Sequence, residues 1–170
     1  MNDFTPWIVL LLAAAAIWIA GSSYLRKQRA QAAEAVVGND FGSLLLAALA
    51  MAAKIDGRID ETERVAMAEV MTQALGAAFA RADVDAALAN AKLSKEELVA
   101  YLAAKSMTFS VEQKTQVLKG VLSVAMADGR FDEREHAIYL DYIAAIGFEH
   151  RTAPQMLQDM VRDMAAGKYS

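Results

Sequence analysis

Cysteine is absent from the 170-residue chain. This absence excludes disulfide scaffolds, cysteine-ligated zinc sites, iron–sulfur clusters and thiol nucleophiles. Only 2 prolines and 9 glycines are present, so the chain is neither a flexible linker nor a low-complexity polymer. The net charge of −4 provides no basic surface for nucleic acid, and we expect no nucleic-acid partner. The length allows one domain with a sizeable core and a short additional segment.

Charge is also absent from a long apolar run near the N-terminus. Residues 7–20 (WIVLLLAAAAIWIA) carry no charged side chain, and the run extends to Tyr24. As a helix, its 18 residues would be about 27 Å long, which is enough for the hydrocarbon core of a membrane. Trp7 at one end and Trp18 or Tyr24 at the other suit the headgroup level. We therefore predict a membrane-spanning helix, with a cleavable signal peptide and a buried core helix as alternatives.

Basic residues follow this apolar run directly. The positive-inside tendency predicts that the N-terminus lies outside the cell and the remainder in the cytoplasm, because the basic residues are Arg26, Lys27 and Arg29. A signal peptide would begin with a positive charge, and this chain has Asn2-Asp3 there. Residues 1–30 hold one of the 21 acidic and three of the 17 basic residues, so the remainder carries a net charge of −6. We predict an acidic domain that is held at the membrane by an N-terminal anchor.

The rest of the chain is predicted to be helical. It lacks the strict alternation of a half-buried strand and is rich in alanine, leucine, methionine, glutamate and lysine. Ser94 with Glu97 has the form of a capping box, Ser110 suits a helix start, and Gly147 suits a helix end. The fold class is therefore all-α, a single transmembrane helix followed by a compact bundle of about seven helices. The bundle helices are expected at 40–54, 61–79, 82–91, 95–105, 111–126, 133–146 and 153–166.

The predicted organisation has four parts. The segments are an anchor over 1–25, a basic juxtamembrane tether over 26–39, the helical domain over 40–166 and a tail over 167–170.

An internal repeat divides the helical domain. Residues 56–63 (DGRIDETE) return 72 residues later as 128–135 (DGRFDERE), with six of eight positions identical. Each copy follows an apolar helix and precedes an amphipathic one. The repeat thus predicts two related helical hairpins, each turning at an acidic corner. The apolar stripes expected after the corners are Ala68, Met71 and Leu75 in the first hairpin, and Tyr139, Tyr142, Ile143 and Ile146 in the second.

One interpretation of the corners is purely structural. Gly57 and Gly129 suit a left-handed position after a helix, and Glu61 and Glu133 suit the positive end of a helix dipole. Helix caps would account for four further acids, with Asp60 and Asp132 as N-caps and Glu63 and Glu135 completing capping boxes.

A second interpretation is a metal site. Asp56 and Asp128 would sit at helix C-terminal ends, where a carboxylate opposes the dipole. If the two corners meet, their carboxylates repel unless a cation lies among them, and an all-oxygen set suits Ca²⁺, Mg²⁺ or Mn²⁺. The candidate ligands are Asp56, Asp60, Glu63, Asp128, Asp132 and Glu135. A third interpretation is an acidic patch that docks a protein partner.

The two DGRxDExE corners within about seven helices resemble the TerB-like domain of tellurite-resistance proteins. The same domain type occurs in the N-terminal region of DjlA-type co-chaperones, which carry a similar membrane helix. The resemblance covers about residues 40–166. It implies a compact helical fold, a divalent-metal site at the six acids named above and a place in the bacterial inner membrane. The chain ends without a J domain or a His-Pro-Asp tripeptide, so stimulation of an Hsp70 partner is not expected.

Other signals are weaker. Glu133 and His136 form an E-x-x-H pair, but a di-iron site needs a second pair that the first repeat lacks. No nucleophile elbow or phosphate loop is present, so neither an enzyme activity nor an organic cofactor is expected. The residues Ala13–Ala16 would permit a homodimer through the anchor. The stripe of Met156, Leu157, Met160 and Met164 is interpreted as core, with a docking groove as the minority interpretation.

These observations predict a membrane-anchored, non-enzymatic module. It would bind a divalent cation through the two corners and signal to an unidentified protein partner in a stress or metal/oxyanion response. The alternative is a metal-independent, co-chaperone-like adaptor whose acidic corners are helix caps.

Overall fold

All regular secondary structure in the described part of the chain is helical. The computed structural model describes residues 5–38, 40–54, 59–129, 133–149, 151 and 153–166. Within them are α1 (Thr5–Val37), α2 (Phe41–Ala52), α3 (Glu61–Leu75), α4 (Arg81–Asn90), α5 (Lys95–Lys105), α6 (Val111–Ala125), α7 (Glu133–Ile146) and α8 (Ala153–Ala165). The all-α prediction is confirmed. Most predicted boundaries agree within two residues, but the helix predicted over 61–79 ends at Leu75 because Gly76 adopts a left-handed φ of 66°.

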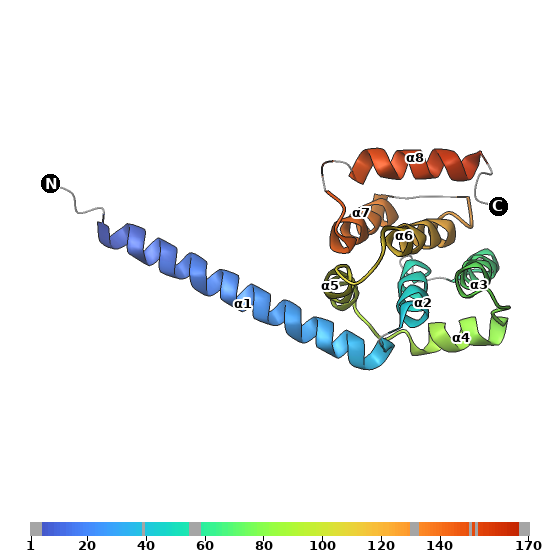
Figure 1. Ribbon diagram of the computed structural model, residues 1–170, viewed down its shortest axis with the longest axis horizontal. Coiled ribbons are helices and arrows are strands. Elements are labelled where there is room, and N and C mark those ends of the chain that lie inside the picture. The colour runs from blue at the N-terminus through green and yellow to red at the C-terminus, as the bar shows by residue number, and fades with distance from the viewer. Residues whose placement is uncertain are drawn as a thin grey trace.

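The anchor and the tether form one continuous helix. α1 projects from the bundle and reaches it only with its last turns (Figure 1). Residues 26–37, predicted as a tether, continue this helix, and Ala33 is fully buried where α1 packs against α5. The Lys105 Nζ lies 2.9 Å from a carboxylate oxygen of Glu34, and the Tyr101 hydroxyl donates to the Gly38 carbonyl. The tether is therefore a docked helix.

The N-terminal part of α1 has the properties of a membrane span. It is the one helix, among the described residues, that is long and apolar enough to cross a membrane. No residue of its apolar window is buried, and Trp7, Leu11 and Trp18 are all exposed by more than 60%. This exposure contradicts the alternative of a buried core helix.

Helix α2, whose sequence is almost entirely apolar, forms the centre of the bundle. Leu44, Leu45, Ala48 and Leu49 are almost fully buried. Asp40 caps its start, with Oδ1 accepting from the Ser43 N–H at 2.8 Å. α2 packs against α3, α4, α5 and α6, which surround it in Figure 1. The residues that precede the first acidic corner are thus held on several sides.

The two hairpins of the repeat are α2–α3 and α6–α7. α6 packs against both helices of the first hairpin, and α8 packs against both helices of the second. The helices therefore stack in one direction, with α8 at one end and α4 toward the other (Figure 1). Equivalent positions 72 residues apart are buried in both hairpins, as Met67 with Tyr139 and Met71 with Ile143 show.

The predicted apolar stripe of the second hairpin is confirmed, but that of the first is partly wrong. Tyr139, Tyr142, Ile143 and Ile146 are buried. In α3 the buried face is formed by Glu63, Met67 and Met71, whereas Ala68 is half-buried and Leu75 is 48% exposed. In α8 the core interpretation holds for Leu157 and Met160, whereas Met156 is half-buried and the side chain of Met164 lies outside the described residues.

Two buried tyrosines on α7 provide a matched pair of substitutions. The Tyr139 hydroxyl donates to the Leu118 carbonyl at 2.9 Å, whereas the Tyr142 hydroxyl has no hydrogen-bond partner among the described residues. Burial raises the pKa of both phenols. We expect Tyr139→Phe to reduce the free energy of unfolding by about 1 kcal/mol, and Tyr142→Phe to leave it unchanged or raise it. Urea unfolding measures both, and equal losses would contradict the assignment.

Candidate functional site

The first acidic corner is a complete capping box. The Asp60 Oδ1 accepts from the Glu63 N–H at 3.0 Å, and the Glu63 Oε2 accepts from the Asp60 N–H at 2.8 Å. Glu63 is 9% exposed because it shares the buried face of α3 with Met67 and Met71. The cap interpretation is therefore confirmed for Asp60 and Glu63.

The Asp60 carboxylate is held in its charged form. Its Oδ1 also accepts from the Thr62 hydroxyl at 2.6 Å. This bond first, and then the Glu63 N–H, keep the pKa of Asp60 below its ordinary value. These bonds use Oδ1, so the cap does not require Oδ2. Asp60 can start α3 and still offer a charged oxygen to solvent or to an ion.

The second corner is described in part. α6 ends at Ala125, and the Gly129 N–H donates to the Met126 carbonyl at 2.9 Å. Gly129 has a φ of 79°, the left-handed conformation that its sequence position predicts. Asp128 is exposed just before it, and Glu135 is half-buried in the first turn of α7. Asp56 and Asp132, the other two predicted ligands, lie outside the described residues.

A surface groove connects the two corners. It lies between the start of α3 and the end of α6, whose axes pack against each other. Glu61 and Thr62 of the first corner line it from one side, and Ser123 and Ala127 line it from the other. Asp128 follows Ala127 directly in the chain. The fold thus brings the start of α3, in the first corner, close to the end of α6, where the second corner begins.

Two ion pairs that the sequence did not predict join α4 to α3. Arg81 pairs with Glu61, and Arg64 pairs with Asp85. Glu61 was expected to stabilise the helix dipole only, and this pairing gives it a second structural role. Pairs between residues about 20 positions apart produce no local sequence signal, because helical spacing links only positions three or four apart.

The described acids do not by themselves form a metal centre. Within the described ranges, no group of three or more histidine, aspartate or glutamate side chains converges closely enough to hold an ion. Glu133 and His136 are among the described residues and belong to no such group, so the described residues provide no di-iron site. Asp56 and Asp132, which would complete a shared site, are not included in that search.

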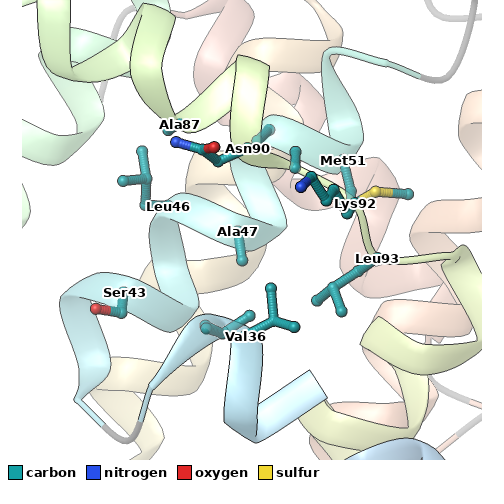
Figure 2. Close-up of a pocket in the computed structure, with 12 residues that line it drawn as sticks. Val36, Ser43, Leu46, Ala47, Met51, Ala87, Asn90, Lys92 and Leu93 are labelled. Carbon is teal, nitrogen blue, oxygen red and sulfur yellow. The ribbon is translucent and has the colours of Figure 1, made fainter. Parts of the chain in front are cut away.

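A separate apolar pocket lies at the base of α1. Figure 2 shows side chains from the end of α1, from α2, and from the end of α4 with the segment that follows it, which converge on the pocket. Val36, Leu46, Met51 and Leu93 provide much of the wall, and its volume of about 160 Å³ would accept one apolar ring or side chain. The pocket unites three distant segments and was not predicted.

Comparison with known families places these features in context. The family model described as Tellurite resistance protein TerB matches residues 43–158, which is more than half of the chain and includes both acidic corners. Comparisons with curated proteins and with solved structures found no match.

Proposed function

Because the chain belongs to the family of the tellurite resistance protein TerB, we propose that it is a non-enzymatic helical module that α1 holds at a membrane. In this proposal the module binds a divalent cation at its two acidic corners and communicates the bound state to a protein partner, in a stress or metal/oxyanion response.

The groove between the corners is the observation that carries the cation proposal. Glu61 and Thr62 of the first corner face Ser123 and Ala127 across it, next to Asp128. The depressed pKa of Asp60 favours its charged form at neutral pH, and its Oδ2 is not needed for the cap. Together with the carboxylates of Asp56 and Asp132, the carboxylate oxygens of Asp60 and Asp128 would suit a hard cation such as Ca²⁺, Mg²⁺ or Mn²⁺.

The proposed response follows from electrostatic repulsion. Without a cation, carboxylates of the two corners repel and favour a wider spacing between the start of α3 and the end of α6. A cation that binds the closer arrangement more tightly shifts the equilibrium toward it. Since α6 contacts both helices of the first hairpin, this shift alters the surface along α3 and α6. That surface is the one proposed to meet the partner.

The anchor proposal rests on the length, apolar character and exposure of α1. Arg26, Lys27 and Arg29 follow the apolar run, and this charge asymmetry favours an orientation with α2–α8 in the cytoplasm of a bacterial cell. Because α1 stays helical to Val37 and packs on α5, the module would be held at a fixed distance from the bilayer.

Titration of the full chain in lipid nanodiscs tests the cation proposal. Metal-stripped protein is titrated calorimetrically with Ca²⁺, Mg²⁺ and Mn²⁺, and one saturable site for at least one ion is expected. In the double variant Asp60→Asn, Asp128→Asn the heat should disappear. Asparagine is as good an N-cap as aspartate, so α3 should keep its start and the thermal midpoint without metal should change little.

Asp40→Asn is the matched control. It makes the same substitution at the N-cap of α2, outside the corners, and should retain the full heat of binding. A double variant that still binds the ion like the parent would show that these carboxylates are not ligands.

The capping box specifically favours a second candidate function. Asp60 and Glu63 are already engaged with each other's N–H groups, as in a corner whose purpose is structural. On this alternative the module is an adaptor that docks its partner without metal. No heat with any ion and no thermal stabilisation would favour it.

A further inference from the structure

One face of α1 combines an apolar groove with two cations. Residues spaced at helical intervals line a shallow hollow along this face, and they include Ala14, Trp18, Gly21, Leu25 and Arg29, with Arg26 at its edge. Gly21 has no side chain, and nothing lies within 4 Å of the position a Cβ would take. The hollow therefore runs between the Trp18 and Leu25 side chains and ends at the arginines.

The two arginines are directed to solvent and not to an acid of α1. Both are exposed, and the Arg26 Nε donates to the Ser22 carbonyl at 3.3 Å, so its side chain folds back toward the apolar run. Glu34, the nearest acid beyond them in α1, is held by Lys105. Glu97 of α5 interacts with the charge of Arg29 and offsets part of it, while its carboxylate also accepts from the Ser94 N–H at 2.8 Å. Both guanidinium groups remain exposed, so the positive charge at the end of the hollow, most of all that of Arg26, is accessible to an anion.

The depth of these groups matches that of a lipid. If the apolar run ends at Tyr24, Arg26 lies about 3 Å and Arg29 about 7.5 Å beyond the hydrocarbon boundary. A headgroup layer is roughly 5–7.5 Å thick on each side of a bilayer. The hollow from Ala14 to Leu25 then lies at the level of acyl chains, while both guanidinium groups lie at the level of phosphates.

We propose that this face binds one anionic phospholipid, with an acyl chain in the hollow beside Trp18 and the headgroup phosphate between Arg26 and Arg29. The inference rests on the proposed anchoring of α1 in a membrane. Charge selects the lipid, because guanidinium groups favour a headgroup with net negative charge over a zwitterionic one. The segment after residue 30 has a net charge of −6 and would be repelled by an anionic membrane, and this contact offsets the repulsion.

Quenching of Trp18 by brominated lipid tests the proposal. Trp7→Phe leaves Trp18 as the only tryptophan of the full chain. This variant is reconstituted in vesicles of equal parts phosphatidylglycerol and phosphatidylcholine, with bromine on the acyl chains of one lipid or of the other. The composition is the same in both vesicles and in both leaflets, so orientation does not matter. We expect stronger quenching by brominated phosphatidylglycerol, with about fivefold enrichment contributed by each arginine.

Variants of the cations locate the site. Arg26→Gln with Arg29→Gln should make quenching by the two lipids equal. Lys27→Gln removes the same charge at the same depth from the opposite face of α1, and it should preserve the preference. The site would be overturned if the preference for phosphatidylglycerol survived in the double arginine variant. It would also be overturned if Lys27→Gln reduced the preference as much as the double arginine variant does.

Two further outcomes separate this inference from the proposed function. Equal quenching of the parent by both lipids would overturn the lipid site and leave the anchor intact. Absence of quenching by either lipid would mean that Trp18 does not enter the bilayer, and it would overturn the anchor together with the lipid site.

Discussion

Replacement of Ala33 by aspartate is expected to release the last turns of α1 from the bundle. Ala33 is 0% exposed and belongs to the continuous apolar core, so the new carboxylate would be buried among apolar side chains where α1 meets α5. An uncompensated buried charge costs about 3–5 kcal/mol. Detachment of a helix end avoids that cost at the loss of its local contacts, such as the Tyr101 hydroxyl bond to Gly38.

Hydrogen exchange measures this release. Amides of residues 30–37 should exchange about a hundredfold faster in Ala33→Asp, whereas amides of α2 and α6 should keep their protection. Ala32→Asp is the matched control, because it makes the same substitution one position away on the exposed side of α1. Similar exchange in the two variants would show that α1 is not docked on α5 in solution.

The helix boundaries were predictable because local side chains set them. Ser94 with Glu97 and Ser110 with Gln113 form capping boxes at the expected positions, and Gly147 ends α7 with a φ of 94°. Each signal involves residues at most four positions apart, and a sequence displays such pairs directly. Gly76 is the same kind of signal, and its omission explains why the third helix was predicted four residues too long.

Packing between helices that are distant in the sequence was harder to predict. The helical tether over 26–37 depends on Ala33 meeting α5, and the pocket in Figure 2 depends on three segments meeting. The stripe of α3 was partly misplaced because its alanines occur on several faces, whereas its two methionines lie on the buried one. The repeat contained the correction, since Met67 and Met71 stand 72 positions before the buried Tyr139 and Ile143.

The candidate site was predicted at the level of its corners. Capping explains Asp60 and Glu63 as the sequence suggested, and the groove brings the start of α3 near the end of α6. Whether the carboxylates share an ion is decided by their relative positions, which a motif does not encode. The metal assignment of all six acids therefore stays a prediction for the titration above.

Gly120 lies where α6 closely approaches α3 and α2, and it provides the second large effect. A Cβ at this position would lie 2.8 Å from Val70 Cγ1 and 3.1 Å from Leu49 Cδ2. In an exposed helix, Gly→Ala gains about 1 kcal/mol from helix propensity. Here overpacking reverses the sign, and we expect Gly120→Ala to lower the free energy of unfolding by about 1–3 kcal/mol. The equivalent position of the first hairpin is Ala48, which is buried.

A double-mutant cycle with Val70→Ala isolates this clash. Val70 is half-buried and presents the methyl group that a Cβ on residue 120 would meet. Val70→Ala alone removes contacts and should also destabilise the fold. In the double variant the new methyl group occupies the space that Val70 leaves, so the combined loss should fall short of the sum of the single losses by about 1 kcal/mol or more. Urea unfolding of the four proteins gives this coupling. Strict additivity would mean that α3 and α6 separate to admit the methyl group, and the groove between the acidic corners would then be as adjustable as a cation-driven closure requires.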